Sequence, residues 1–251
     1  MQRKNEILRL FKQLKEKNSV EIESKIIDFK QIIELFSTTI DYESPDEYLV
    51  IDDTTYMLEH FQVSIFENDD GGDLYSIAVN SDEKQLYSRF NKIKAINLNP
   101  SVENLYLSTK KCVEKHIRNY SRYLENIKKV NENRNYKLIF LIEDISNDII
   151  IDDKEGYVTA LFIFEIVNEL VKYEMLDGVI CFNKTMLGNF VICKDKESMK
   201  AELMSLPKKD NLKIKISLNQ IFLDVCRTKG FLGNMNDELS VTDSVEVLKN
   251  N

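Results

Sequence analysis

The sequence predicts an α/β protein, with a mixed central sheet flanked by helices and two further helices at the N-terminal end. Two observations support this class. Short apolar runs with strand-like character recur along the chain, and segments with apolar residues at three- and four-residue spacing lie between them. Strands and helices therefore alternate after a first hairpin, and we expect helices on both faces of the sheet.

Composition narrows the kind of protein. The 251-residue chain has a formal net charge of −8. That charge disfavours indiscriminate binding to nucleic acid, although a local basic face can still bind it. With two histidines and four widely spaced cysteines, a zinc site is not expected. Cys181 and Cys193 lie in apolar runs, which predicts buried free thiols in a reducing compartment.

The apolar segments of the sequence predict where in the cell the protein is found. The N-terminus is charged, and no apolar run approaches the roughly 20 residues of a membrane span. We therefore expect a cytoplasmic protein with no membrane partner.

We divide the chain into three parts. Residues 1–40 are expected to form a helical pair packed on the core, residues 41–236 the α/β core domain, and residues 237–251 a polar, acidic tail. The two N-terminal helices are predicted from two apolar stripes: Ile7, Leu10, Phe11 and Leu14, then Ile22, Ile26, Phe29, Ile33 and Phe36.

The core domain begins with strands. A short apolar strand over 48–51 ends in Asp52 and Asp53, and an alternating strand over 56–65 follows. The acidic, glycine-containing segment 67–73 predicts a turn, so that residues 74–79 return as the second strand of a hairpin.

The remaining elements alternate between helix and strand. The longest helical pattern runs from about Pro100 to Arg134, and a strong strand over 137–142 ends in Glu143 and Asp144. After it we expect a helix over 157–173, strands over 178–182 and 190–193, a short helix over 195–205, an edge strand over 212–216 and a helix over 218–226.

Glu59 is the best single indication of a functional site. Alternation in the strand 56–65 places it on the same face as Met57, Phe61 and Val63, which is the apolar face. Burying a charge there is costly unless a partner, a proton or a metal ion compensates it.

Acidic residues in or after strands suggest a Mg²⁺ site. Asp52 or Asp53, Glu59, and Glu143 or Asp144 are the candidates, because acids at strand ends can converge on one hard divalent ion. Such an ion polarises a phosphoryl group and activates water. The alternative is that the strand-terminal acids face water and mark where the strands stop.

The long predicted helix has a basic side. Its cations suit a row of phosphates, and Tyr120 and Tyr123 nearby suit stacking on a base. The alternative is an ordinary solvated helix face, since Glu114 and Glu125 interrupt the neighbourhood. The candidate nucleic-acid-binding residues are Lys111, Lys115, Arg118 and Arg122.

Other catalytic patterns are missing from the sequence. It contains no Walker-type phosphate loop, no Rossmann glycine fingerprint and no nucleophile elbow. His60 and Ser64 share a strand face but are poorly spaced for a nucleophile and its base. His116 is expected to be a partly exposed residue on the long helix.

The order of helix, acid-ended strand, hairpin with an internal Glu, long helix and strand resembles the core of the PD-(D/E)xK nucleases, over roughly residues 40–195. The resemblance implies that Asp52 or Asp53 matches the family's Asp and that Glu59 matches its Glu. The family's lysine position falls on Phe61, and the resemblance implies that Lys137 takes its place. In general character the chain is also similar to abortive-infection proteins of bacterial phage defence.

Two hypotheses follow. The first is a nuclease acting on RNA or DNA in antiphage defence, with Asp53, Glu59 and Glu143 binding Mg²⁺ and Glu59, Asp53 and Lys137 as catalytic residues. The second is a non-catalytic α/β module that senses or binds another protein.

Overall fold

The computed structural model describes most of the predicted core domain. The described residues are 20–23, 40–41, 44–66, 100–132, 135–146, 148–152, 156–159, 161–185, 188–216 and 245–247.

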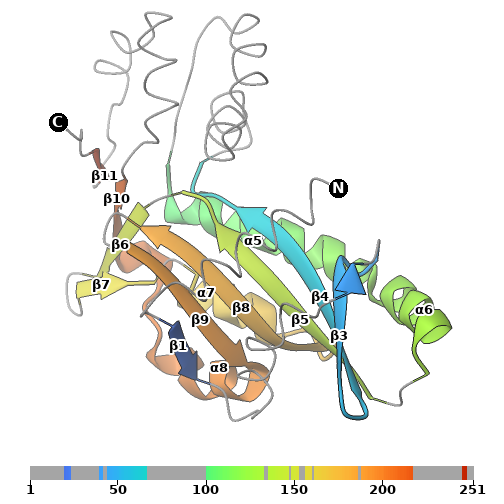
Figure 1. Ribbon diagram of the computed structural model, residues 1–251. Helices are drawn as coiled ribbons and strands as arrows, with labels where there is room; N and C mark the ends of the chain where they lie inside the picture. The colour runs from blue at the N-terminus through green and yellow to red at the C-terminus, as the bar shows by residue number, and fades with distance from the viewer. Residues whose placement is uncertain are drawn as a thin grey trace, which may run out of the picture.

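A seven-stranded mixed sheet forms the centre of the described part (Figure 1). Three neighbouring strands, β4, β5 and β8, run parallel, and the pairs β8/β9, β4/β3 and β3/β2 are antiparallel, while β1 is parallel to β9. The mixed α/β sheet is therefore confirmed. In spatial order the strands are β1 (Val20–Glu23), β9 (Gly188–Asp195), β8 (Leu176–Thr185), β5 (Asn135–Asp144), β4 (Thr54–Val63), β3 (Glu47–Ile51) and β2 (Ile40–Asp41).

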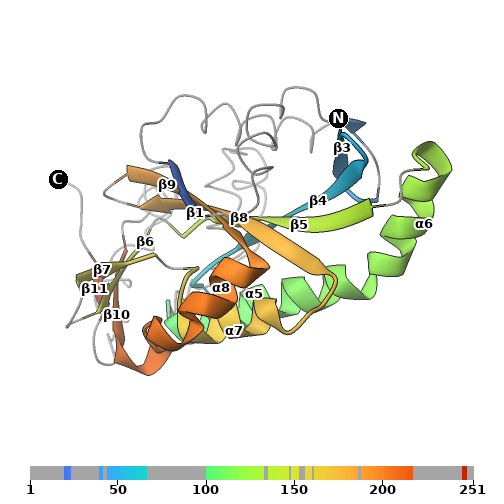
Figure 2. The same ribbon diagram turned by 90° about the horizontal axis from the view of Figure 1, so that it is seen from below.

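The described helices lie on one face of this sheet, as Figure 2 shows. They are α5 (Val102–Arg118), α6 (Tyr120–Val130), α7 (Phe164–Val171) and α8 (Lys196–Glu202). The core lies between them and the sheet, where Leu105 and Val113 of α5 are fully buried with Phe140 of β5. Helices on the opposite face, which the sequence predicts, are not found among the described residues.

The long predicted helix is two helices in sequence. Ser101 caps its start, since its Oγ accepts a hydrogen bond from the backbone N–H of Asn104 at 3.0 Å. At Asn119 the backbone N–H bonds to the carbonyl of His116, three residues back, which interrupts the regular helical pattern for one residue. The chain then continues as α6.

A second, four-stranded sheet lies at one end of the molecule (Figure 1). The short 3₁₀ helices η2 (Leu203–Ser205) and η3 (Lys209–Asn211) lead into it. In spatial order the strands of the second sheet are β11 (Val245–Val247), β10 (Leu212–Ile216), β6 (Asp148–Asp152) and β7 (Gly156–Val158).

Among the described helices, none has the length and apolar character needed to cross a membrane.

Several predicted elements need correction. Residues 20–23, which helical spacing predicted as part of a helix, form strand β1, because Val20, Glu21, Ile22 and Glu23 alternate with period two and pair with β9. The rest of the predicted N-terminal helical pair lies outside the described residues, as do the return strand over 74–79 and the helix over 218–226.

Three corrections concern the C-terminal half. The helix predicted over 157–173 begins only at Phe164, because residues 156–158 pair with β6 as strand β7. The predicted edge strand β10 is internal to the second sheet, between β6 and β11. Strand β11 comes from the segment predicted as a polar tail, and it pairs in parallel with β10.

Candidate functional site

Glu59 lies inside the protein, as the alternation of its strand predicts. It is in the middle of β4, with 4% of its surface exposed, and it faces the helix layer with Met57, Phe61 and Val63. The carboxylate is therefore enclosed by groups of the protein.

His116 of α5 is the direct partner of Glu59. Its Nδ1 atom lies 3.2 Å from Oε2 of Glu59 and 3.1 Å from the hydroxyl of Tyr123 on α6. The imidazole stacks on Phe61, with ring centroids 5.2 Å apart, and meets Phe140 edge-on at 6.1 Å. These contacts hold the ring in one orientation against the carboxylate.

The electrostatics of this network follow from its burial. Desolvation raises the pKa of Glu59, and the nearby Asp46 raises it further, while the hydrogen bond from His116 lowers it in part. Burial also raises the pKa of Tyr123, and so do the charge and hydrogen bond of Glu59. Tyr123 is thus a protonated donor, buried at 2% exposure, and it is not available to stack on a base as the sequence suggested.

The structure does not bring the predicted metal ligands together. Asp53 lies in the exposed turn between β3 and β4, whereas Glu143 is one residue from the far end of β5, beside Gln62 of β4. About nine residues of β4 separate these positions, which is roughly 30 Å along a strand. Asp53 and Glu143 cannot share an ion with Glu59 at such separations.

Strand register also prevents Glu143 and Glu59 from binding the same ion. Glu59 pairs with Phe140, so Glu143, three residues further along β5, points to the opposite face of the sheet. Within the described residues, no three His, Cys, Asp or Glu side chains are grouped closely enough to hold a metal ion. The donors predicted for Mg²⁺ therefore do not fit one shared ion.

Each displaced acid has a local explanation. Asp52 and Asp53 form the two-residue loop of the β3–β4 hairpin, with Asp52 at a φ of 50°, a left-handed conformation that Asp tolerates. Glu143 accepts a hydrogen bond from Nε2 of Gln62 at 2.9 Å and lies 3.3 Å from Nε2 of His60. It thus belongs to a separate polar group on the far face.

Asp144 and Lys137 also have structural roles. Asp144 is buried, and its Oδ1 accepts hydrogen bonds from the backbone N–H and the hydroxyl of Ser146, which turns the chain at the end of β5. Lys137 lies on the sheet face opposite Glu59, with Nζ 5.5 Å from the centre of the Tyr56 ring. It does not take the lysine position beside Glu59 that the nuclease resemblance implies.

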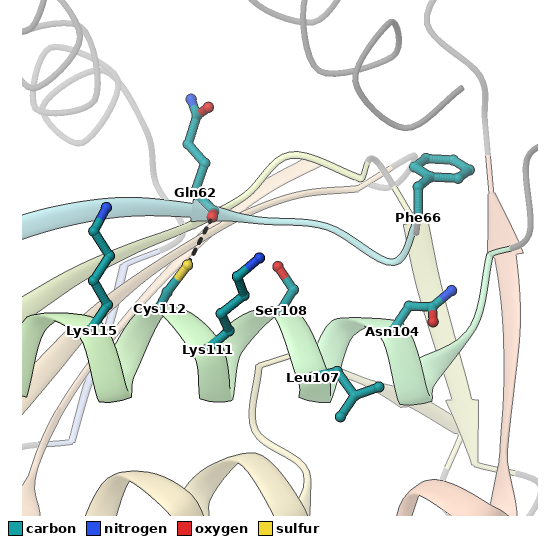
Figure 3. Close-up of a pocket in the computed structure, with 8 residues that line it drawn as sticks. All are labelled: Gln62, Phe66, Asn104, Leu107, Ser108, Lys111, Cys112 and Lys115. Carbon is teal, nitrogen blue, oxygen red and sulfur yellow. Dashed lines mark hydrogen bonds between the residues drawn. The ribbon is translucent and has the colours of Figure 1, made fainter. Parts of the chain in front are cut away.

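A pocket of about 450 Å³ lies between α5 and the last part of β4. Strand β3 pairs with β4 only as far as Leu58, so in the described part no strand covers this edge of β4 beyond that residue. Helix α5 lies there instead, and the Sγ of Cys112 donates to the carbonyl of Gln62 at 3.9 Å (Figure 3). The pocket is lined by Gln62, Phe66, Asn104, Leu107, Ser108, Lys111, Cys112 and Lys115.

One stripe of α5 supplies most of the polar lining. Asn104, Ser108, Lys111 and Lys115 follow one another at four-, three- and four-residue spacing, which places them on one side of a helix. In Figure 3 their side chains rise on the same side of α5 as Phe66, whereas Leu107 points away. The predicted Lys111 and Lys115 are thus brought to a pocket.

The same spacing continues beyond the pocket. Arg118 and Arg122 follow Lys115 by three and seven residues, and all four cations are exposed. No ion pair links any of the four to a carboxylate in the part of the chain that the structure describes. We call Lys111, Lys115, Arg118 and Arg122 the basic row.

Sequence reasoning missed several residues of these sites, and Asn104, Ser108 and His116 are the polar ones on α5. Asn104 and Ser108 carry no charge, but their spacing from Lys111 would have indicated that they share its helix side. Nothing in the sequence paired His116 with Glu59, because that contact depends on how α5 packs on β4.

The thiol in the pocket is suppressed as a nucleophile. Burial raises the pKa of Cys112, and the positive charges of Lys115 and Lys111 lower it only in part. Cys112 is partly exposed, whereas Cys181 and Cys193 are buried free thiols, as predicted.

Comparison of the chain with models of known protein families, with characterised proteins and with solved structures gave no match.

Proposed function

We propose that this protein is a nucleic-acid-binding α/β module that holds a phosphate backbone along the outer side of α5 and α6. One observation carries the proposal: four exposed cations, without ion pairs to described carboxylates, follow one another on α5 and the first turn of α6 in a chain of net charge −8. Because most of the protein repels polyanions, a concentrated local row is the part able to attract one.

The length of the basic row suits several phosphates. Lys111 and Arg118 are separated by about 10 Å along α5 at a rise of about 1.5 Å per residue, and Arg122 follows in the first turn of α6. Lysine and arginine contacts of this kind position a backbone without reading its sequence. The proposal therefore predicts binding that depends strongly on salt and weakly on sequence.

The test is a binding titration of fluorescent RNA and DNA oligonucleotides, followed by anisotropy. The variant K111Q/K115Q is compared with K110Q/K200Q, which changes the net charge equally. Lys110 is on the same helix and pairs with Glu114, and Lys200 pairs with Glu197 on α8. We expect K111Q/K115Q to weaken binding to every sequence alike and the control to bind as the wild type does. Equal losses in both variants would contradict the proposal.

Cleavage of the bound nucleic acid is a second proposal. It is supported by the Glu59–His116 pair, which lies one helical turn from the pocket, since His116 follows Cys112 by four residues. The residues predicted to bind Mg²⁺ do not fit a shared ion, so the proposal assigns the reaction to Glu59 and His116 and to no metal ion.

Cleavage of labelled RNA and DNA is to be measured with Mg²⁺ and with a chelator, for the wild type, Glu59→Gln and the exposed control Glu125→Gln. Loss of cleavage in Glu59→Gln alone would support the second proposal. Cleavage that persists undiminished in Glu59→Gln would show that Glu59 has no part in the reaction. A wild type that cleaves neither RNA nor DNA would contradict the second proposal and would not affect the proposal of nucleic-acid binding.

The cytoplasmic, antiphage setting is also part of the proposal. Its test is the efficiency of phage plating on bacteria that express the wild type or K111Q/K115Q. Protection that requires the two lysines would support this setting, and equal plating with and without the protein would contradict it.

A further inference from the structure

The pocket and the basic row form one continuous surface. Asn104 and Ser108 extend the spacing of the row toward the start of α5, so that the polar stripe runs 104, 108, 111, 115, 118 and 122. Phosphates that lie along the row therefore lead directly to the pocket at its N-terminal end.

The two ends of the pocket differ in chemistry. Lys111 and Lys115 are at the end that joins the basic row, whereas Phe66, Asn104 and Ser108 are at the other (Figure 3). Phe66 is only 4% exposed, so the amide of Asn104 and the hydroxyl of Ser108 are the groups at this end that suit the hydrogen-bonding edge of a flat heterocycle. The lysines suit the phosphate attached to it.

The size of the pocket is consistent with such a ligand. At about 450 Å³ it falls within the range of small-molecule sites and has room for one nucleotide.

We infer that the pocket receives one unstacked base of a single-stranded nucleic acid whose backbone lies on the basic row. This inference rests on the proposed function and adds the class of ligand. A base inside a duplex is stacked between its neighbours and cannot enter a pocket, whereas bases of a single strand can turn outward. The protein therefore prefers single strands to duplexes.

The test compares three probes of equal length by fluorescence anisotropy: a single strand, its duplex, and a strand made only of abasic sites. We expect the wild type to bind the single strand roughly fivefold to tenfold more tightly than either other probe, the gain that one or two net hydrogen bonds to a base supply. Ser108→Met fills the pocket and Asn104→Ala shortens its lining, and neither changes charge. Both should reduce binding of the single strand to the level of the abasic probe.

The matched control is Ser121→Met, an exposed residue of α6 that does not line the pocket. It should leave all three affinities unchanged, and thermal unfolding checks that each variant is folded. If the three probes bind alike, or if Ser121→Met acts like Ser108→Met, the inference is overturned. If K111Q/K115Q still weakened the binding of all probes in that case, the proposed function would be supported without the base-binding pocket. Polyglutamate that competes as well as nucleic acid would overturn both.

Discussion

Replacing Glu59 by glutamine is expected to remove one pH-dependent part of the stability of this protein. Burial raises the pKa of Glu59 in the folded protein above the ordinary value of about 4.5 that it has in the unfolded chain. Between the two pKa values the folded protein binds more protons than the unfolded chain. The free energy of unfolding should therefore fall as the pH rises from about 4.5 through the folded pKa, and then level off.

The size of the effect is bounded by linkage and by the hydrogen bonds. A single group contributes at most about 1.4 kcal/mol per pH unit within this window. Glutamine does not titrate, and its carbonyl keeps one acceptor for His116 and Tyr123. Glu59→Ala leaves both donors without that acceptor, so it should be less stable than Glu59→Gln by about 1 to 3 kcal/mol.

The assay is urea unfolding followed by circular dichroism at several pH values between 4.5 and 8. The wild type and the exposed control Glu125→Gln should share the decline with rising pH, and Glu59→Gln should lack that contribution. Identical pH profiles for the wild type and Glu59→Gln would refute the reasoning, because the buried carboxylate would then titrate as it does in the unfolded chain.

Further predictions concern the groups around the two sites. Tyr123→Phe removes the hydroxyl that bonds to His116 and should lower the free energy of unfolding by about 1 to 3 kcal/mol in urea titrations; unchanged stability would contradict the network. Alkylation of Cys112, followed by mass spectrometry, should be slower than that of a free thiol at pH 8 and should accelerate above pH 9, because burial raises its pKa. A rate equal to that of a free thiol would argue against this burial. Ser146→Ala removes a donor to buried Asp144 and should cost about 1 to 2 kcal/mol by thermal unfolding, with no change in melting temperature as the opposing result.

Local patterns predicted the parts of the fold that depend on local chemistry. The period-two alternation of 56–65 gave both the strand β4 and the buried position of Glu59. Helical spacing indicated one long helix, which the structure divides into α5 and α6, and with it the exposed side that carries Lys111 and Lys115. In each case one residue's environment follows from its immediate neighbours in sequence.

The structure does not bring the three predicted carboxylates together, and the cause is the pairing between strands, which the sequence of one strand does not determine. Whether Glu143 shares a face with Glu59 depends on the register between β4 and β5, and the pairing of Glu59 with Phe140 sets it to the opposite face. Asp53 lies far from Glu59 because Asp52 and Asp53 together form the loop of the β3–β4 hairpin, in which Asp52 adopts a positive φ.

The pocket was equally hidden from sequence reasoning. It exists because β3 stops pairing at Leu58 and α5 then lies along the remaining edge of β4. That arrangement is a property of tertiary packing. Six of the lining residues belong to α5, and Gln62 and Phe66 come from β4 and the residues after it, so the pocket forms only when the two elements pack together.

The salt dependence of nucleic-acid binding tests the central claim most directly. If the four cations of the basic row each neutralise one phosphate of a single strand, the slope of log K against log salt concentration should be about −3 for the wild type. It should become shallower by about 1.4 in K111Q/K115Q and stay unchanged in K110Q/K200Q. A slope that is the same in the wild type and in K111Q/K115Q would show that Lys111 and Lys115 do not contact the phosphates, and would contradict the account.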